Sequence, residues 1–409
     1  NEDCLLYITI YFDCFFNSSL RANSIDSLKL VIKSTKNDTL RIQLLKIVGE
    51  EEAIFRIGYW DTLKLECELK LKNCPESKKY FFQKYLSLFI NNVGYVADEQ
   101  GDLRLALESY KKSVEICNEI NDKIGYAKAL NNIGSVYDNI GDVANSLDYY
   151  HRSLKIREKI NDEKGVAVCL NNIGYIFYKQ KDYEKALKYY NSGLKIYEKI
   201  NNEQLAAITN SNIGLIYLNR KNYAYALRYL QKARDTQEKI NDIFNLSQST
   251  NNLATLFEAQ NNIGQALKLY EENLALQEQL NYKKGIAVTL GNIAQLYFKL
   301  GKTNEALVKA EKSLDIIQEV GFPDYICTTS LLLSKIYEKK GNYRDAYTMY
   351  VLHKKMSDSL NSSETRRVSI QKELQYEYEK KETILKSNQD KKDSINKAEI
   401  AKQKLVRNA

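Results

Sequence analysis

A four-residue pattern returns at one fixed interval along most of this chain. Asn131-Asn132-Ile133-Gly134 recurs unchanged at residues 171–174, and related tetrads stand at residues 91–94, 211–214, 251–254, 291–294 and 331–334. A register kept over seven copies indicates a stack of similar units. One such unit cannot bury its apolar face alone, so its stability must come from its neighbours. The chain is therefore expected to fold as an elongated repeat array.

Each copy carries the pattern of two antiparallel helices. A large ring stands three positions after the small residue of the tetrad in six copies, as in Tyr137 and Phe177, and a small side chain such as Ser146 or Ala186 follows nine positions later. Turn pairs such as Gly141-Asp142 separate the two halves. Small residues allow the two helices to approach closely, and a ring from one helix then fills the space over the small residue of the other.

This spacing resembles the tetratricopeptide repeat over residues 81–360. The period is forty positions rather than the usual thirty-four, and the proline that often closes the unit is absent, since the whole chain has two prolines. Forty-residue versions with an Asn before the apolar-small pair resemble those of kinesin light chains and spindle-orientation adaptors, which bind peptides. The resemblance implies an all-α fold, a right-handed superhelical solenoid of helix hairpins with seven such units.

The N-terminal residues allow two interpretations. Residues 1–24 contain an apolar run followed by Ala22-Asn23-Ser24, which is the pattern of a signal peptide with its cleavage site. Asp13 interrupts the run and no basic residue precedes it, so a helix or strand that caps the array is the alternative. Residues 25–80 are expected to form a degenerate capping repeat, with Trp60 in its core.

The C-terminal residues 361–409 are rich in Lys, Glu and Gln and contain neither proline nor glycine. They are expected to form one long helix, with a weak coiled coil and a possible homodimer through residues 362–409. Residues 371–382 and 401–408 resemble the connector that follows tetratricopeptide arrays in membrane-bound signalling proteins of the Bacteroidetes type. In that family the connector leads to a transmembrane helix and an output domain, which is a histidine kinase, a nucleotide cyclase or a DNA-binding regulator.

No constellation of residues in the sequence supports catalysis. His151 and His353 stand far apart in the repeat register, the seven cysteines form no CxxC pair, and no glycine-rich phosphate motif occurs. We therefore expect no enzyme, no metal site and no cofactor. The net charge of +8 is modest, and Lys alternates with Glu along most of the predicted helices, so no nucleic-acid surface is expected either.

A binding face is predicted on the first helix of each unit. If the small residue and the ring face the core, the first Asn of the tetrad and the residues one and four positions beyond the small residue face the inside of the superhelix. Asn amides can pair with both the N–H and the C=O of an extended peptide, and rings can cover its side chains. The predicted peptide or partner groove comprises Asn91, Tyr95, Asp98, Asn131, Asp138, Asn171, Tyr175, Tyr178, Leu215, Leu218, Asn251, Glu258, Gln295 and Phe298.

The role of the two asparagines of the tetrad differs in this interpretation. The second Asn, as in Asn132 and Asn172, is expected to form a hydrogen bond that ties one repeat to the next. For the first Asn, ligand contact and a structural role both remain open. The groove mixes acidic, aromatic and aliphatic side chains, and this composition does not identify one ligand.

Two functions follow from these patterns. The first is the sensor region of a membrane-anchored signalling protein, on the extracytoplasmic (periplasmic) face, in which peptide or protein binding is relayed through the coiled-coil connector to an output domain. The membrane would be reached only through a segment beyond residue 409. The alternative is a stand-alone, soluble adaptor or scaffold in the cytoplasm that binds a protein partner in the same groove.

Overall fold

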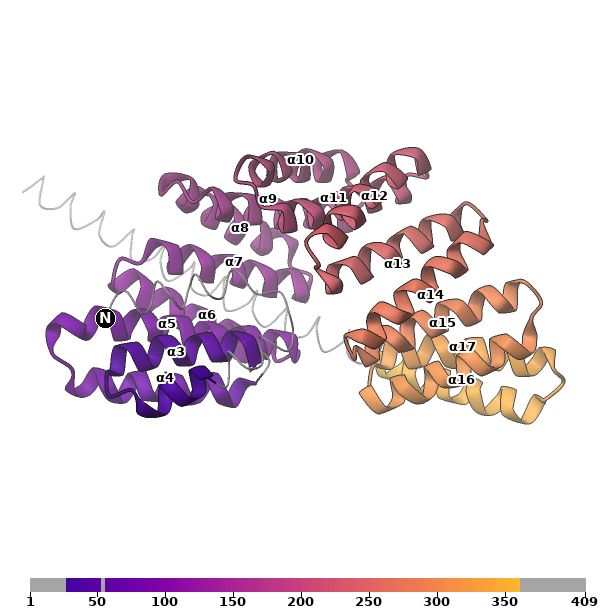
Figure 1. The fold of residues 1–409 in the computed structure, drawn as a ribbon, viewed down its shortest axis with the longest axis horizontal. Coiled ribbons are helices and arrows are strands. Elements are labelled where there is room, and N and C mark those ends of the chain that lie inside the picture. Colours follow the sequence, from indigo (N-terminus) through magenta and orange to yellow (C-terminus); the bar gives the residue numbers. More distant parts are fainter. Residues whose placement is uncertain (1–26, 53–55, 361–409) are drawn as a thin grey trace, which may run out of the picture.

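The computed structural model describes residues 27–52 and 56–360, in which every regular element is an α-helix. The helices are stacked one after another into an arch (Figure 1). Their bounds are α3 (Asp38–Glu52), α4 (Ile57–Asn73), α5 (Glu76–Glu99), α6 (Leu103–Glu119), α7 (Lys123–Ile140), α8 (Val143–Lys159), α9 (Glu163–Lys179), α10 (Tyr183–Lys199), α11 (Glu203–Asn219), α12 (Tyr223–Lys239), α13 (Ile243–Ala259), α14 (Ile263–Gln279), α15 (Lys283–Lys299), α16 (Thr303–Val320) and α17 (Pro323–Lys339). Residues 27–34 and 343–360 are also helical. The predicted all-α solenoid is confirmed.

The helices pair in sequence order. α7 packs most extensively against α8, α9 against α10, and α11 against α12, and each pair then stacks on the next. From α7 onwards the first helix of each pair begins forty positions after the one before, at Lys123, Glu163 and Glu203 for example. The repeat in the sequence is therefore a repeat of helix hairpins.

One type of turn joins most of the successive helices. The residue after the helix end has a positive φ, as in Gly101 (80°), Asn121 (57°) and Gly141 (88°), a region that glycine and asparagine enter with little strain. The next residue caps the following helix: the Asp122 Oδ1 atom accepts from the Gly125 amide at 3.1 Å, and Asp142 does the same for Asn145. The Gly-Asp and Asn-Asp pairs thus define the helix boundaries.

The two helices of a hairpin approach most closely at the last residue of the tetrad. A Cβ atom added to Gly134 would lie 2.9 Å from the ring of Tyr150, and one added to Gly174 would lie 3.0 Å from the ring of Tyr190. Tyr150 and Tyr190 are themselves almost fully buried. The prediction that a ring of one helix fills the space over a small residue of the other is confirmed.

A second ring pair stands beside this contact. Tyr137 stacks on Tyr149 with ring centroids 5.4 Å apart, and the pair Phe177 and Tyr189 repeats the arrangement in the next hairpin at 5.5 Å. Offset stacking of this kind adds to the stabilisation from burial alone. The ring three positions beyond the small residue therefore packs within its own hairpin.

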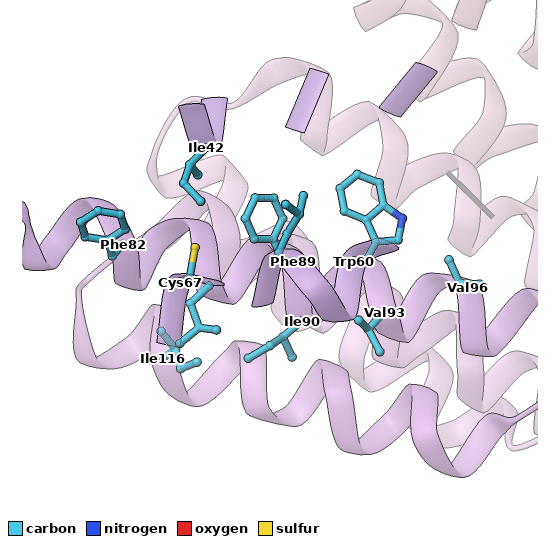
Figure 2. Packing of buried hydrophobic residues seen from close by; sticks show 11 residues of the cluster. Ile42, Trp60, Cys67, Phe82, Phe89, Ile90, Val93, Val96 and Ile116 are labelled. Carbon is cyan, nitrogen blue, oxygen red and sulfur yellow. The ribbon is translucent and has the colours of Figure 1, made fainter. Parts of the chain in front are cut away.

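Helices α3, α4 and α5 form an N-terminal unit around Trp60. The Trp60 side chain is 1% exposed and stacks on Phe89 at 6.0 Å, and Figure 2 shows the two rings side by side near Ile42 and Cys67. α3 runs antiparallel to α4, with Arg41 paired to Glu66 at 3.1 Å. The predicted core role of Trp60 is confirmed. The predicted signal peptide at residues 1–24 and the predicted long helix at residues 361–409 lie outside the described residues.

The predicted extracytoplasmic, membrane-anchored location is wrong by this structure. Within residues 27–52 and 56–360 no helix combines the length and the apolar character that crossing a bilayer requires. The repeat helices carry charged residues throughout, as in α10 with Glu184, Lys185, Lys188, Lys195, Glu198 and Lys199.

We expect Gly134→Ala to lower the unfolding free energy by about 1–3 kcal/mol, because the added methyl group must displace the buried Tyr150 ring. Gly264→Ala is the matched control, since nothing lies within 4 Å of a Cβ at that helical position. It should be neutral or stabilising, by at most about 1 kcal/mol. Thermal and urea unfolding followed by circular dichroism measures both. Equal stability of the two variants would contradict the close approach.

Candidate functional site

The first helices of the hairpins line the inside of the arch. α5 contacts α7, α7 contacts α9, α11 contacts α13, and α15 contacts α17, whereas successive second helices in the described part of the chain make no comparable contact. In Figure 1, α10 lies at the outer edge of the arch with α9 and α11 beneath it. The array therefore curves towards its first helices. The candidate site is this inner face.

The predicted groove residues fall into three rows along the inner face. The first row holds the first residue of each tetrad. The second row holds the residues one position beyond the small residue, and the third row holds those four positions beyond it. Their exposure differs strongly: Tyr175 is 47% and Tyr95 36% exposed, while Asn91, Asn131 and Asp138 are buried. The other predicted groove residues are intermediate, except Gln295, which is exposed.

A ladder of amide hydrogen bonds runs along the first row. The Asn132 Nδ2 atom donates to Asn91 Oδ1 at 3.1 Å, and Asn172 Nδ2 donates to Asn131 Oδ1 at 3.0 Å. Asn252 Nδ2 donates to Ser211 Oγ at 3.1 Å. Each bond links consecutive first helices at the same offset along the chain. These bonds confirm that the second Asn of the tetrad ties repeats together at positions 132, 172 and 252, and they also occupy the first Asn at positions 91 and 131.

A second ladder runs along the third row with the same offset along the chain. Asn139 Nδ2 donates to Asp98 Oδ1 at 2.9 Å, Lys179 Nζ to Asp138 Oδ1 at 2.7 Å, and Asn219 Nδ2 to the Tyr178 hydroxyl at 2.9 Å. Lys299 forms an ion pair with Glu258. The sequence analysis missed Asn139, Lys179, Asn219 and Lys299, although their fixed offset from the predicted row was a usable signal.

Burial shapes the charges of the inner face. It raises the pKa of the Asp98 carboxyl above its usual value, an effect that the hydrogen bond from Asn139 partly offsets. Asp138 is more deeply buried, with a side chain that is 10% exposed, and Lys179 neutralises it. The acidic residues of the predicted groove are therefore partnered within the array.

The structure brings together one cysteine and one histidine that the sequence analysis treated separately. His353 Nδ1 lies 3.2 Å from Cys327 Sγ and 3.0 Å from the Cys327 carbonyl oxygen. In earlier repeats Ser153 and Ser313 occupy the position of His353, and each donates to a carbonyl oxygen at the equivalent place on the first helix, at 2.7 Å. His353 therefore stands in a structural position between the two helices of the last hairpin. Among the residues that the structure describes, no group of His, Cys, Asp and Glu could hold a metal ion.

Comparison with family models matches most of the array. The model described as tetratricopeptide repeat matches residues 125–199, 205–279 and 285–351, and a second model of the same description matches residues 89–120. Together these matches cover more than half of the chain. The chain belongs to the tetratricopeptide repeat family. Comparison of the sequence with curated proteins gives no match.

Solved structures of several tetratricopeptide-type solenoids are similar in fold. The apo form of the quorum sensor NprR from B. thuringiensis aligns with a TM-score of 0.57 and 15% identity, over 87% of this chain and 99% of that one. A Rap protein complexed with competence and sporulation factor aligns with a TM-score of 0.56 and 16% identity, over 88% and 99%. The apo form of RapI gives 0.52 and 20% identity, over 68% and 99%. At these identities the likeness concerns the fold.

We expect Lys179→Met to lower the unfolding free energy by about 1–2 kcal/mol, because it leaves the buried Asp138 carboxylate without its cation. The estimate is modest since the Lys179 side chain is 43% exposed. The double variant Lys179→Met with Asp138→Asn removes the unpaired charge and should recover most of the loss. Thermal unfolding at pH 7 compares the original chain, the single variant and the double variant. If Lys179→Met were as stable as the original chain, the ion pair between Lys179 and Asp138 would contribute nothing to stability.

Proposed function

We propose that this tetratricopeptide repeat protein is an adaptor that binds an extended peptide segment of a partner protein on its inner face. The observation that carries the proposal is the line of rings and amides that successive first helices place on the inner face, with Tyr95 and Tyr175 as its most exposed rings. Rings can cover apolar side chains of a peptide, and amides can satisfy its backbone. The array presents these groups in a fixed register, which lowers the entropy lost on binding.

The comparisons support a binding role. The similar Rap protein structure holds the competence and sporulation factor, and NprR is described as a quorum sensor. Both resemble this chain in fold over most of their length. The inner face lacks a catalytic constellation within the described residues, and its acidic groups serve the inter-repeat ladders. We therefore propose binding without chemical conversion, and we place no relay or output domain in the proposal.

Selection from a phage library of random nonapeptides against the whole chain tests the proposal. Selected peptides should bind with dissociation constants in the micromolar range, about −8 kcal/mol. A triple variant that covers the inner face on α7, α11 and α13, with Ser135→Arg, Leu215→Arg and Thr255→Arg, should weaken binding at least tenfold, about 1.4 kcal/mol.

Lys195→Ala provides the control, because Lys195 is exposed on the second helix α10. It should leave the affinity unchanged, and circular dichroism verifies that all variants are folded. Failure to select any peptide, or peptides that bind the triple variant as well as the original chain, would refute the proposed function.

A further inference from the structure

We infer that the peptide binds at the junction of α9 and α11, and that it is an uncharged segment with apolar side chains. This inference rests on the proposed function and adds the place and the chemical class of the ligand. Three independent features meet at this junction: an amide that the ladder leaves free, a group of four apolar side chains, and neutralised charges on both sides.

The first feature is a break in the amide ladder of the first row. At this junction Asn171 Nδ2 donates to Thr209 Oγ1 at 2.8 Å instead of joining the ladder, and its Oδ1 atom is buried without a hydrogen-bond partner. Asn212, the equivalent of Asn132 and Asn172, makes no side-chain hydrogen bond within residues 27–52 and 56–360. Its half-buried amide therefore offers both a donor and an acceptor to a peptide backbone.

A glycine in the neighbouring second helix makes room for the turned side chain of Asn171. A Cβ atom at Gly193 would lie 3.0 Å from Asn171 Oδ1, so the missing side chain leaves the space into which Asn171 turns. In the preceding repeat, Ser153 fills the equivalent position and bonds to the Ala127 carbonyl. There Asn131 stays in the ladder and accepts from Asn172. Gly193 therefore leaves the space that the turned Asn171 side chain occupies.

The second feature is an apolar patch formed by Tyr175, Tyr178, Leu215 and Leu218. These residues occupy the second and third rows in two consecutive repeats, and the Tyr175 and Tyr178 rings stack at 6.3 Å. Every other repeat has a polar or charged residue in at least one of these two rows. Tyr175 is 47% exposed, and the other three side chains are intermediate. Leu215 lies one helical turn after Asn212, so the patch adjoins the free amide on the same face of α11.

The third feature is the state of the flanking charges. Asp138 in the repeat before the patch is paired with Lys179, and Glu258 in the repeat after it is paired with Lys299. A charged peptide side chain would have to displace one of these partners, so its charge would add little to the binding free energy. An apolar side chain only has to displace water from the tyrosine and leucine surfaces. The junction therefore favours an uncharged apolar segment.

The spacing of the helices sets the length of the segment. Packed helices lie about 8–10 Å apart and an extended chain rises about 3.3 Å per residue, so a peptide that crosses the first helices advances about three residues per repeat. The two repeats of the patch therefore accommodate about six residues. Side chains alternate along an extended chain, so apolar residues two positions apart would both face the patch.

Matched substitutions at equivalent repeat positions test the inference with the selected nonapeptides as probes. Asn212→Ala should weaken binding about five- to tenfold, the loss of one or two hydrogen bonds, and Leu215→Glu more than tenfold, because it places a charge in the apolar patch. Tyr175→Ser provides a second patch variant should Leu215→Glu fail to fold. The controls are Asn132→Ala, which occupies the same repeat position as Asn212, and Lys195→Ala on the second helix α10.

The controls should leave the affinity unchanged, and Asn132→Ala should instead lower the melting temperature because it breaks the bond to Asn91. The selected sequences should share apolar residues two positions apart and carry little charge. Peptides that lose affinity with Asn132→Ala but not with Asn212→Ala or Tyr175→Ser would overturn this inference and leave the proposed function standing. Failure to select any peptide would overturn both.

Discussion

The close approach of a ring to a glycine inside a hairpin is the contact on which the rest of the structure depends. Tyr150 over Gly134 and Tyr190 over Gly174 set the distance between the two helices of a repeat. A close contact at this place recurs with the period of the repeat, with Tyr110 over Gly94 and Leu230 over Gly214, so successive hairpins stack in one orientation. That orientation brings the first helices to the inner side of the arch, where side chains of consecutive repeats can form hydrogen bonds.

The inner face therefore serves both stability and binding, and the same amides cannot do both. At the first two repeat junctions each ladder is closed, by Asn132 and Asn172 in the first row and by Asn139 and Lys179 in the third. Of these ladder bonds, the junction of α9 and α11 keeps only the one from Asn219 to Tyr178. A binding function at that junction would use the Asn212 amide, which forms no bond between repeats in the part of the chain that the structure describes.

The sequence predicted the repeat period, the hairpins and the helix boundaries because each depends on local residue types at fixed offsets. Gly141 followed by Asp142 ends one helix and caps the next whatever the neighbours are. It also predicted the inter-repeat role of the second Asn. The rotamer of Asn171 could not be predicted, since it depends on Gly193 in the other helix of the hairpin and on Thr209 in the next repeat. The burial of Asn91 and Asp138 could not be predicted from the sequence either, because packing between first helices determines it.

Amide hydrogen exchange of the whole chain with and without a selected nonapeptide tests the central claim most directly, because exchange slows where binding suppresses local opening. The account predicts that added protection is concentrated in α9, α11 and α13, and above all in residues 171–179 of α9 and 203–219 of α11. Protection confined to the second helices α8, α10 and α12, or to α5 and α6, would contradict a peptide site on the inner face at the open junction.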